Sequence, residues 1–255
     1  MITIVPVRAF KDNYIWIIRD DMQHTAWVVD PGDASPVNQY LQEHKLELKG
    51  ILITHHHSDH SGGVADLLDK WGAVPVYAST KSKVPFVSHF VKEGDEVNCG
   101  LLKLKVVEIP GHTLDHIAFY NNEIIFCGDT LFSAGCGRVF EGTFEQMYFS
   151  LSKILKMNPS LKIYCGHEYT LQNLKFAEHV EPANQFIQDK INWASQLMTE
   201  GKPTLPSLLQ DEMKMNPFLR CNESSVIQAA EKFAKNDLTT SEDVFKALRE
   251  WKNQF

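Results

Sequence analysis

The chain has 255 residues, 44% of them hydrophobic, so it can form one large domain, or a medium one and a small one, with a substantial core. Its formal net charge of −7 argues against a nucleic-acid partner, which would require a basic face. No apolar run approaches the ~20 residues that span a bilayer, and residues 1–6 lack the features of a signal peptide, so we expect a cytoplasmic protein with no membrane partner.

The first part of the chain, to about residue 165, alternates short strand patterns with helix patterns. A helix is predicted to begin near Ser35, a favoured N-cap, with Pro36 in its first turn, and to continue to Leu41. Turns are predicted at Asp12-Asn13 and at residues 30–33. The strands predicted before the histidine-rich segment are 3–9, 14–19, 26–30 and 50–53.

A histidine-rich segment, residues 54–60, follows the last of these strands. Four of its seven residues are histidines and a fifth is an aspartate. Such a cluster is unlikely to serve only core packing, because each buried ring nitrogen needs its own hydrogen-bond partner. One metal ion, in contrast, binds several rings at once. An exposed polar loop or an expression tag is the alternative, but a tag would stand at a terminus.

Further elements follow the histidine-rich segment. Apolar residues recur at helical spacing up to Trp71, which predicts a helix over residues 61–71 that ends at Gly72. Thr143 and Gln146 have the spacing of a capping box and predict the start of another helix. The strands predicted in this part are 74–77, 102–108, 117–120, 123–126 and 162–165.

From Thr170 onward the pattern is helical, and we find no convincing strand. Pro203 and Pro206 interrupt the periodicity. We therefore expect an α/β catalytic domain over residues 1–168 and a small all-α domain over residues 169–255. The helices predicted in the second domain are 171–180, 183–198, 224–233 and 241–251.

Seven side chains are candidate metal ligands. In the pattern His55-x-His57-x-Asp59-His60, alternate residues of an extended segment point the same way, so the first two can reach one ion while the last two face a second. Each of the other three follows a predicted strand and a glycine, which allows a sharp turn. These three are His112, Asp129 and His167.

The seven candidates divide between two ions. Asp129 can bridge them, since a carboxylate has two oxygens. The first site would hold His55, His57 and His112, and the second would hold Asp59, His60 and His167. Such ligands suit zinc, iron or manganese, and two ions roughly 3.5 Å apart can hold a water as hydroxide. A lone His112 or His167 would more often be a satisfied core histidine, so the whole set carries the hypothesis.

The remaining histidines and the cysteines receive plainer interpretations. His56 should face away from its neighbours in a structural or supporting role, and the other histidines outside the set, His116 apart, should be exposed. The five cysteines are scattered without a CxxC pair, which favours a reducing compartment and argues against disulfides or a thiolate zinc site. Cys136, between two glycines, is more often a small residue in a tight loop than a nucleophile.

These motifs resemble the metallo-β-lactamase superfamily and, within it, the hydroxyacylglutathione hydrolases, or glyoxalase II. The histidine motif identifies only the superfamily. The narrower match rests on Gly135-Cys136-Gly137-Arg138 and on Arg249, Lys252 and Phe255 in the pattern R-x-x-K-x-x-F. The other matching stretches are 54–60, 111–113, 128–132, 141–143 and 164–170.

The resemblance implies a four-layer αββα sandwich followed by the small helical domain, which binds substrate. It implies hydrolysis of S-D-lactoylglutathione to glutathione and D-lactate, the second step of methylglyoxal detoxification, by a metal-bridged hydroxide. Two divalent ions per chain are expected, zinc first and iron or manganese as alternatives, with Asp59 and Asp129 as catalytic residues. The residues expected to hold glutathione are Arg138, Tyr169, Arg249 and Lys252.

Arg249 and Lys252 can also be interpreted without the family resemblance. Arg249 and Lys252 are three apart on a predicted helix and so share a face, which could be a solvated basic end that suits the helix dipole. The two carboxylates of glutathione, however, need a local basic cluster on an acidic protein. Some family members have Tyr where this chain has Phe140, so we expect no polar contact there.

Alternatives on the same fold are a persulfide dioxygenase with one iron, or a thioesterase of other specificity. A nuclease is disfavoured by the negative charge. A structural metal in a binding module is disfavoured because structural zinc sites are usually rich in cysteine. No association helix is evident, so we expect a monomer.

Overall fold

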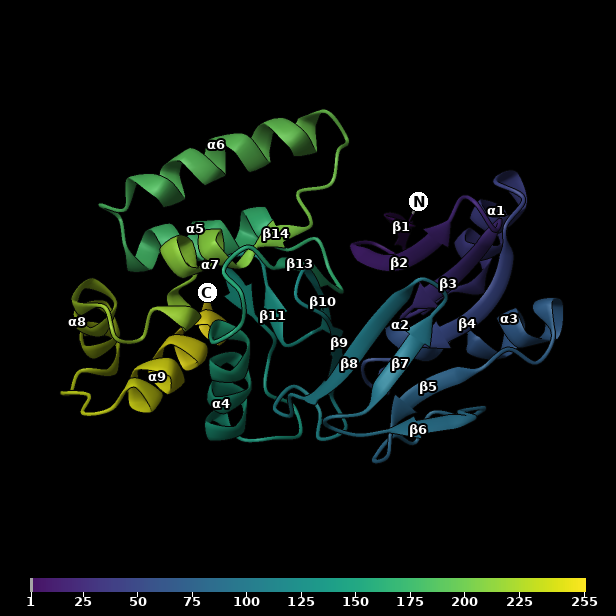
Figure 1. Ribbon diagram of the computed structural model, residues 1–255. Helices are drawn as coiled ribbons and strands as arrows, with labels where there is room; N and C mark the ends of the chain where they lie inside the picture. Colours follow the sequence, from purple (N-terminus) through teal and green to yellow (C-terminus); the bar gives the residue numbers. More distant parts are fainter. Residues whose placement is uncertain (1) are drawn as a thin grey trace.

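The computed structural model describes residues 2–255; Met1, where the predicted first domain begins, lies outside them. Two six-stranded sheets pack face to face and helices cover their outer faces (Figure 1). The layers run helix, sheet, sheet, helix, and a helical part follows. This architecture confirms the αββα sandwich expected from the sequence.

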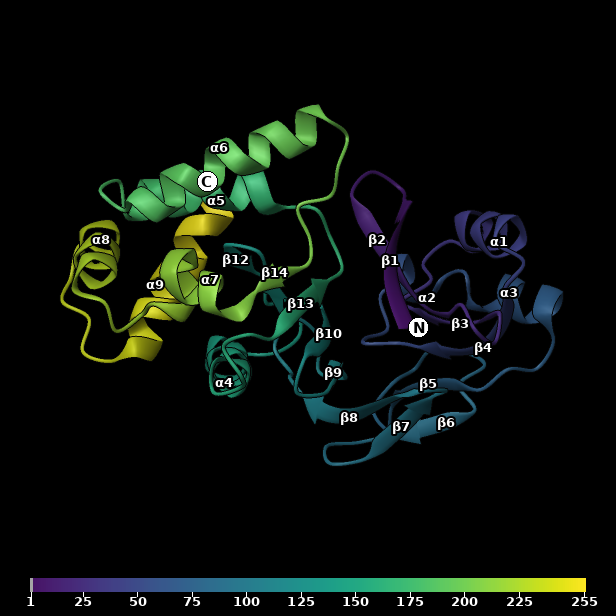
Figure 2. The ribbon, with the colours of Figure 1, turned by 45° about the horizontal axis from the view of Figure 1, so that its top comes forward.

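The first sheet is formed by the N-terminal strands. Its order is β1 (Ile2–Ala9), β2 (Asn13–Asp20), β3 (Thr25–Val29), β4 (Glu47–Leu52), β5 (Val76–Ser79) and β6 (His89–Val91). The strands from β1 to β3 pair antiparallel, and those from β3 to β6 pair in parallel. Helices α1 (Ala34–Glu43) and α3 (Val64–Trp71) cover its outer face, where Val37 and Leu67 belong to the same buried cluster as Ile51 (Figure 2).

The second sheet has the order β14 (Ser207–Leu208), β13 (Lys162–Cys165), β10 (Ile124–Gly128), β9 (Ile117–Tyr120), β8 (Leu102–Glu108) and β7 (Glu96–Cys99). Helix α4 (Phe144–Leu155) lies on its outer side, and Thr143 with Gln146 forms the predicted capping box at its start. A small hairpin of β11 (Leu131–Phe132) and β12 (Gly135–Cys136) follows β10. Trp16 of β2 and Phe119 of β9 lie together in the core between the sheets.

Three of the expected elements are corrected by the structure. The helix expected over residues 61–71 is two helices, α2 (Ser58–Ser61) and α3, because the Gly63 N–H donates to Pro31 O at 2.8 Å and not along the helix. Only a glycine fits there, since a Cβ at Gly63 would lie 2.6 Å from Ala34 N. The N-cap of α1 is Asp33, whose Oδ1 accepts a hydrogen bond from Ser35 N. A strand does occur after Thr170, since β14 pairs antiparallel with β13.

The C-terminal part packs onto the sandwich through a continuous core. Its helices are α5 (Thr170–Val180), α6 (Gln185–Thr199), α7 (Leu209–Met215), the 3₁₀ turn η1 (Pro217–Leu219), α8 (Ser224–Ala234) and α9 (Ser241–Gln254). Phe218 and Phe245 lie in the same buried cluster as Met147 of α4. The domain division at residue 168 stays a prediction. Among the described residues, no helix is long and apolar enough to cross a membrane.

Candidate active site

Loops at one edge of the two sheets bring the seven candidate ligands together. The segment with His55, His57, Asp59 and His60 follows β4 directly. Strands β10 and β13 are parallel, so the residues after them meet at the same edge. The loop between β8 and β9 supplies His112.

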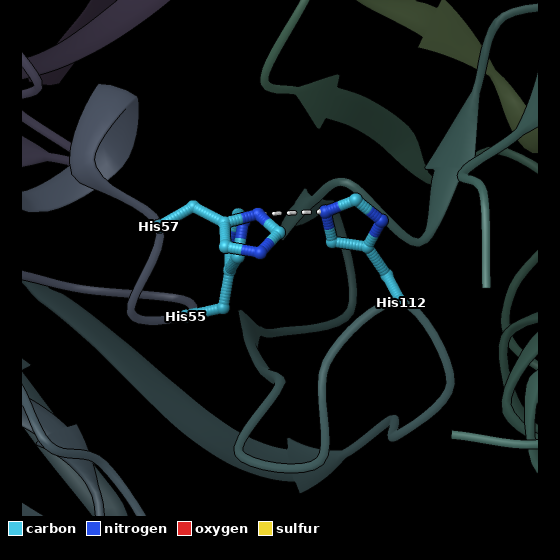
Figure 3. A group of neighbouring side chains, drawn as sticks. All are labelled: His55, His57 and His112. Carbon is cyan, nitrogen blue, oxygen red and sulfur yellow. Dashed lines mark hydrogen bonds between the residues drawn. The ribbon is translucent and has the colours of Figure 1, made fainter. Parts of the chain in front are cut away.

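Three imidazole nitrogens converge in the first half of the site (Figure 3). His57 Nδ1 lies 3.2 Å from His55 Nε2 and 3.1 Å from His112 Nε2. One ring nitrogen carries at most one hydrogen, so it cannot donate to both neighbours. A cation placed among the three nitrogens would satisfy all of them.

The second half of the site contains Asp59, His60 and His167. His60 Nε2 lies 3.3 Å from His167 Nε2. Asp59 Oδ2 lies 3.6 Å from His60 Nε2 and 3.4 Å from His167 Nε2. Asp129 touches both halves: its Oδ1 lies 3.3 Å from His60 Nε2, and its Oδ2 lies 3.5 Å from His112 Nε2. The Oδ1 atom is buried and lacks a hydrogen-bond partner among the described residues.

Four of the histidines are oriented by a contact at the nitrogen that points away from the site. Each contact gives the outer N–H an oxygen acceptor and so leaves the inner nitrogen with its lone pair toward the cluster. The contacts join His55 Nδ1 to Thr54 Oγ1 (3.0 Å), His60 Nδ1 to Asp30 Oδ2 (3.0 Å), His112 Nδ1 to Arg138 O (2.8 Å) and His167 Nδ1 to Asp12 Oδ1 (2.8 Å). This donor set fits a pair of divalent metal ions.

Three of these supporting side chains were missed as functional residues in the sequence. Asp12 was interpreted only as a turn residue, Asp30 only as a residue of a strand end and turn, and Thr54 only as the first residue of the histidine-rich segment. Asn13, in the same turn as Asp12, donates from Nδ2 to Asp59 Oδ2 at 3.0 Å. Their turn positions gave no local signal of this role, because each partner is distant in the sequence.

The electrostatics of the cluster favour positive charge at its centre. Burial alone would raise the pKa of the Asp129 carboxyl, but His60 and His167 hold that pKa well below its usual range. Burial alone would lower the pKa of His167, but Asp129 and Asp59 raise it to about 10. The carboxylates of Asp59 and Asp129 thus stabilise positive charge on the neighbouring histidine rings. A metal ion can supply this positive charge in place of the protons on the rings.

Two glycines permit the close approach of the ligands. At Gly166 a Cβ would lie 2.6 Å from both Asp129 Oδ1 and His60 Cε1. At Gly137 it would lie 1.9 Å from Asp129 O. The glycine before His167, which was interpreted as a turning point, is therefore also needed for space.

A cavity of about 500 Å³ opens on the metal-ligand cluster. The four residues expected to hold glutathione, Arg138, Tyr169, Arg249 and Lys252, all line it. Phe140 also lines it and is exposed beside His112, with 5.2 Å between ring centroids. One wall of the cavity is therefore the ligand cluster and another is basic.

The two basic residues of α9 have different surroundings. Arg249 is buried; its Nη1 donates to Cys136 O at 2.7 Å, and its guanidinium lies over the Phe218 ring. Lys252 Nζ has a single long hydrogen bond, 3.4 Å to Gln172 O. Burial, with the nearby charge of Arg249, lowers the pKa of Lys252 to about 8.

The remaining side chains agree with their plainer interpretations. His24, His44, His89 and His179 are exposed. His116 is buried, and its Nε2 accepts a hydrogen bond from Asp129 N at 3.1 Å. Burial raises the pKa of the Cys136 thiol, which argues against a nucleophile. His56 turns to Asp115 and Glu141, away from the cluster.

Comparisons with known proteins cover the whole chain. Residues 10–167 match the model of the metallo-beta-lactamase superfamily, and residues 168–255 match that of the hydroxyacylglutathione hydrolase C-terminus. The chain is 48% identical to a hydroxyacylglutathione hydrolase of Aeromonas hydrophila, with full coverage of both chains. It is 44% identical to that of Nitrosomonas europaea, covering 100% of this chain and 97% of the relative.

A solved structure supports the fold alone. The crystal structure of ETHE1 from Myxococcus xanthus superimposes with a TM-score of 0.66 at 22% identity, covering 99% of this chain and 98% of the other. The fold together with the His/Asp clusters indicates a site for divalent metal ions.

Proposed function

The chain belongs to the hydroxyacylglutathione hydrolases of the metallo-β-lactamase superfamily, and on this premise we propose that it hydrolyses S-D-lactoylglutathione to glutathione and D-lactate. It is a thioester hydrolase acting on a small molecule. The observation that carries the proposal is the cavity in which five of the seven candidate ligands face a basic wall, with His55 and His60 buried behind them.

The metal ligands are assigned by this proposal as two sets that share Asp129. His55, His57 and His112 would hold one ion, and Asp59, His60 and His167 would hold the other. Two divalent ions so held would lower the pKa of a bound water and polarise the thioester carbonyl. We propose zinc, with iron and manganese as alternatives, since these ligands suit all three.

The protein's own side chains hold and orient the substrate. Arg138, Arg249 and Lys252 present positive charge to the carboxylates of glutathione. Tyr169, stacked on His167, packs against the glutathione backbone. Asp59, anchored by Asn13, orients the attacking water. The C–S bond then breaks and glutathione leaves as a thiolate; with a thiol pKa of about 8.5 it needs little help from an acid.

The experiment that tests the function follows the loss of ultraviolet thioester absorbance on adding the purified protein to S-D-lactoylglutathione, with coenzyme A thioesters in parallel. We expect fast hydrolysis confined to the glutathione ester, which a chelator abolishes and added zinc restores. Two bound ions without hydrolysis would leave the metal site in place and refute the substrate assignment.

The alternatives are not favoured. Full-length relatives at 44% and 48% identity are hydroxyacylglutathione hydrolases, which disfavours a persulfide dioxygenase or another thioesterase. Oxygen uptake with glutathione persulfide would support the dioxygenase. A monomeric state and a cytoplasmic location stay predictions; all five cysteines are free and buried, as a reducing compartment allows.

A further inference from the structure

His56 stands between two ligand candidates, yet both of its ring nitrogens face carboxylates outside the metal cluster. Nδ1 lies 2.9 Å from Asp115 Oδ1, and Nε2 lies 3.3 Å from Glu141 Oε1. Asp115 is buried and Glu141 is exposed. Neither ring nitrogen therefore faces the seven-residue cluster, although His56 belongs to the histidine-rich segment.

The three residues come from three loops that build the site. His56 follows β4, Asp115 lies in the β8–β9 loop that carries His112, and Glu141 lies in the β12–α4 segment that carries Arg138. His56 therefore links the histidine-rich segment to both of the other loops through its side chain.

The partners of His56 are themselves held in place. Thr113 Oγ1 donates to Asp115 Oδ1 at 2.7 Å, and Leu114 N donates to Glu141 Oε2 at 2.9 Å. The backbone N–H of Glu141 also donates to His112 O at 3.3 Å. The β8–β9 loop and the β12–α4 segment thus form one joined unit, to which the His56 ring docks.

One ligand candidate depends on this docking more than the others. Of the five histidines in the cluster, His57 is the one that is not buried, so packing restrains it least. Its Nδ1 lies 3.1 Å from His112 Nε2 and must stay close to that atom if both are to reach one ion. His56 is its immediate neighbour in the chain and holds that backbone against the loop of His112.

We propose that His56 is a positioning residue, which clamps the His55–His57 segment to the Asp115–Glu141 unit and so sets the distance between His57 and His112. The inference rests on the proposed function, in which these two rings share a metal ion. Groups that support metal ligands from outside typically change metal affinity or activity 10–100-fold.

The test uses three variants that dissect the two contacts. His56→Asn retains a donor near the position of Nδ1, His56→Gln retains one near Nε2, and His56→Ala retains neither. We expect His56→Ala to lower the affinity for one of two zinc ions and kcat by about 10–100-fold, with KM within about twofold. His56→Asn should recover most of the loss, because the Asp115 contact is shorter and buried.

Zinc per chain, measured by mass spectrometry after equilibration with a competing chelator, is read beside kcat and the melting temperature. His44→Ala, at an exposed histidine in the C-cap of α1, is the matched control and should behave as the wild type. A wild type that binds fewer than two zinc ions would refute the proposed function, not only the clamp.

The clamp itself is overturned in two ways. Wild-type zinc affinity and kcat in His56→Ala would do so, and so would equal losses in all three variants, since the loss would then not follow the contacts to Asp115 and Glu141. The double variant His56→Ala/Glu141→Ala supplies a check of its own: a shared role predicts a loss smaller than the sum of the single losses, and additive losses contradict it. If His56→Ala does not fold, His56→Asn and His56→Gln still decide the question.

Discussion

The charge of Lys252 should make kcat/KM depend on pH, and the substitution Lys252→Met should remove this part of the pH dependence. Its ammonium donates a long hydrogen bond of 3.4 Å to Gln172 O and lies over the rings of Phe176 and Phe255. Burial, with the neighbouring charge of Arg249, lowers its pKa to about 8. The group is therefore charged below pH 8 and loses its charge as the pH rises through that value. A substrate carboxylate held by Lys252 should lose this contact over the same interval.

The size of the effect follows from the bond that is lost. A hydrogen bond to a charged group contributes about 1.5–3 kcal/mol, which corresponds to roughly 10–100-fold in kcat/KM. Lys252→Met should therefore lower kcat/KM for S-D-lactoylglutathione by about this factor at pH 7 and approach the wild type at pH 10. Lys252→Arg keeps its charge over the whole range of the assay and should keep the wild-type advantage throughout.

The assay is the initial rate of thioester loss between pH 6 and 10, corrected for spontaneous hydrolysis. Titrations at the metal centre affect all variants alike, so the ratio of wild type to Lys252→Met isolates the lysine. Lys246→Met, at an exposed position of the same helix, is the control and should leave the ratio near one. A ratio that stays constant from pH 7 to 10, or a Lys252→Met variant with full kcat/KM, would refute the reasoning.

Three further substitutions test the site. Asp59→Ala should cost on the order of 100-fold or more in kcat and lower the metal content, because Asp59 is assigned as a ligand; wild-type turnover with two bound ions would sink the assignment. Cys136→Ala should keep kcat within about threefold of the wild type, since a buried thiol of raised pKa is a poor nucleophile. Loss of nearly all turnover would instead support Cys136 as a catalytic nucleophile. Gly166→Ala should reduce metal binding, because its Cβ would lie 2.6 Å from Asp129 Oδ1. Gly94→Ala strains a backbone with φ +91°, but its Cβ has nothing within 4 Å, so it should retain metal binding even if it lowers the melting temperature; equal metal content in both would contradict the steric argument.

Elements with strong local patterns could be predicted from the sequence. The strands 102–108, 117–120 and 162–165 coincide with β8, β9 and β13, and the capping box at Thr143 marks the start of α4. Strands of two or three residues, such as β6, β11 and β14, are too short to show a period. The break at Gly62-Gly63 was hidden because its cause is a contact with residues 31–34.

In the candidate site, too, the residues with a local sequence pattern could be predicted and those defined by distant contacts could not. Its seven proposed ligands could be identified because each follows a strand, and the structure brings all seven together. The residues that orient them could not, because Asp12 and His167 are 155 positions apart in the sequence. The partners of His56 likewise come from two loops that only the folded chain brings close.

The location of Arg249 and Lys252 in α9 has a consequence for synthesis. The candidate ligands all lie between residues 55 and 167, whereas the basic wall of the cavity is completed only by residues 249 and 252. A chain made from its N-terminus acquires the imidazole cluster well before it acquires the means to recognise an anionic thioester. We therefore expect hydrolysis of an anionic thioester only after α9 has docked onto the sandwich.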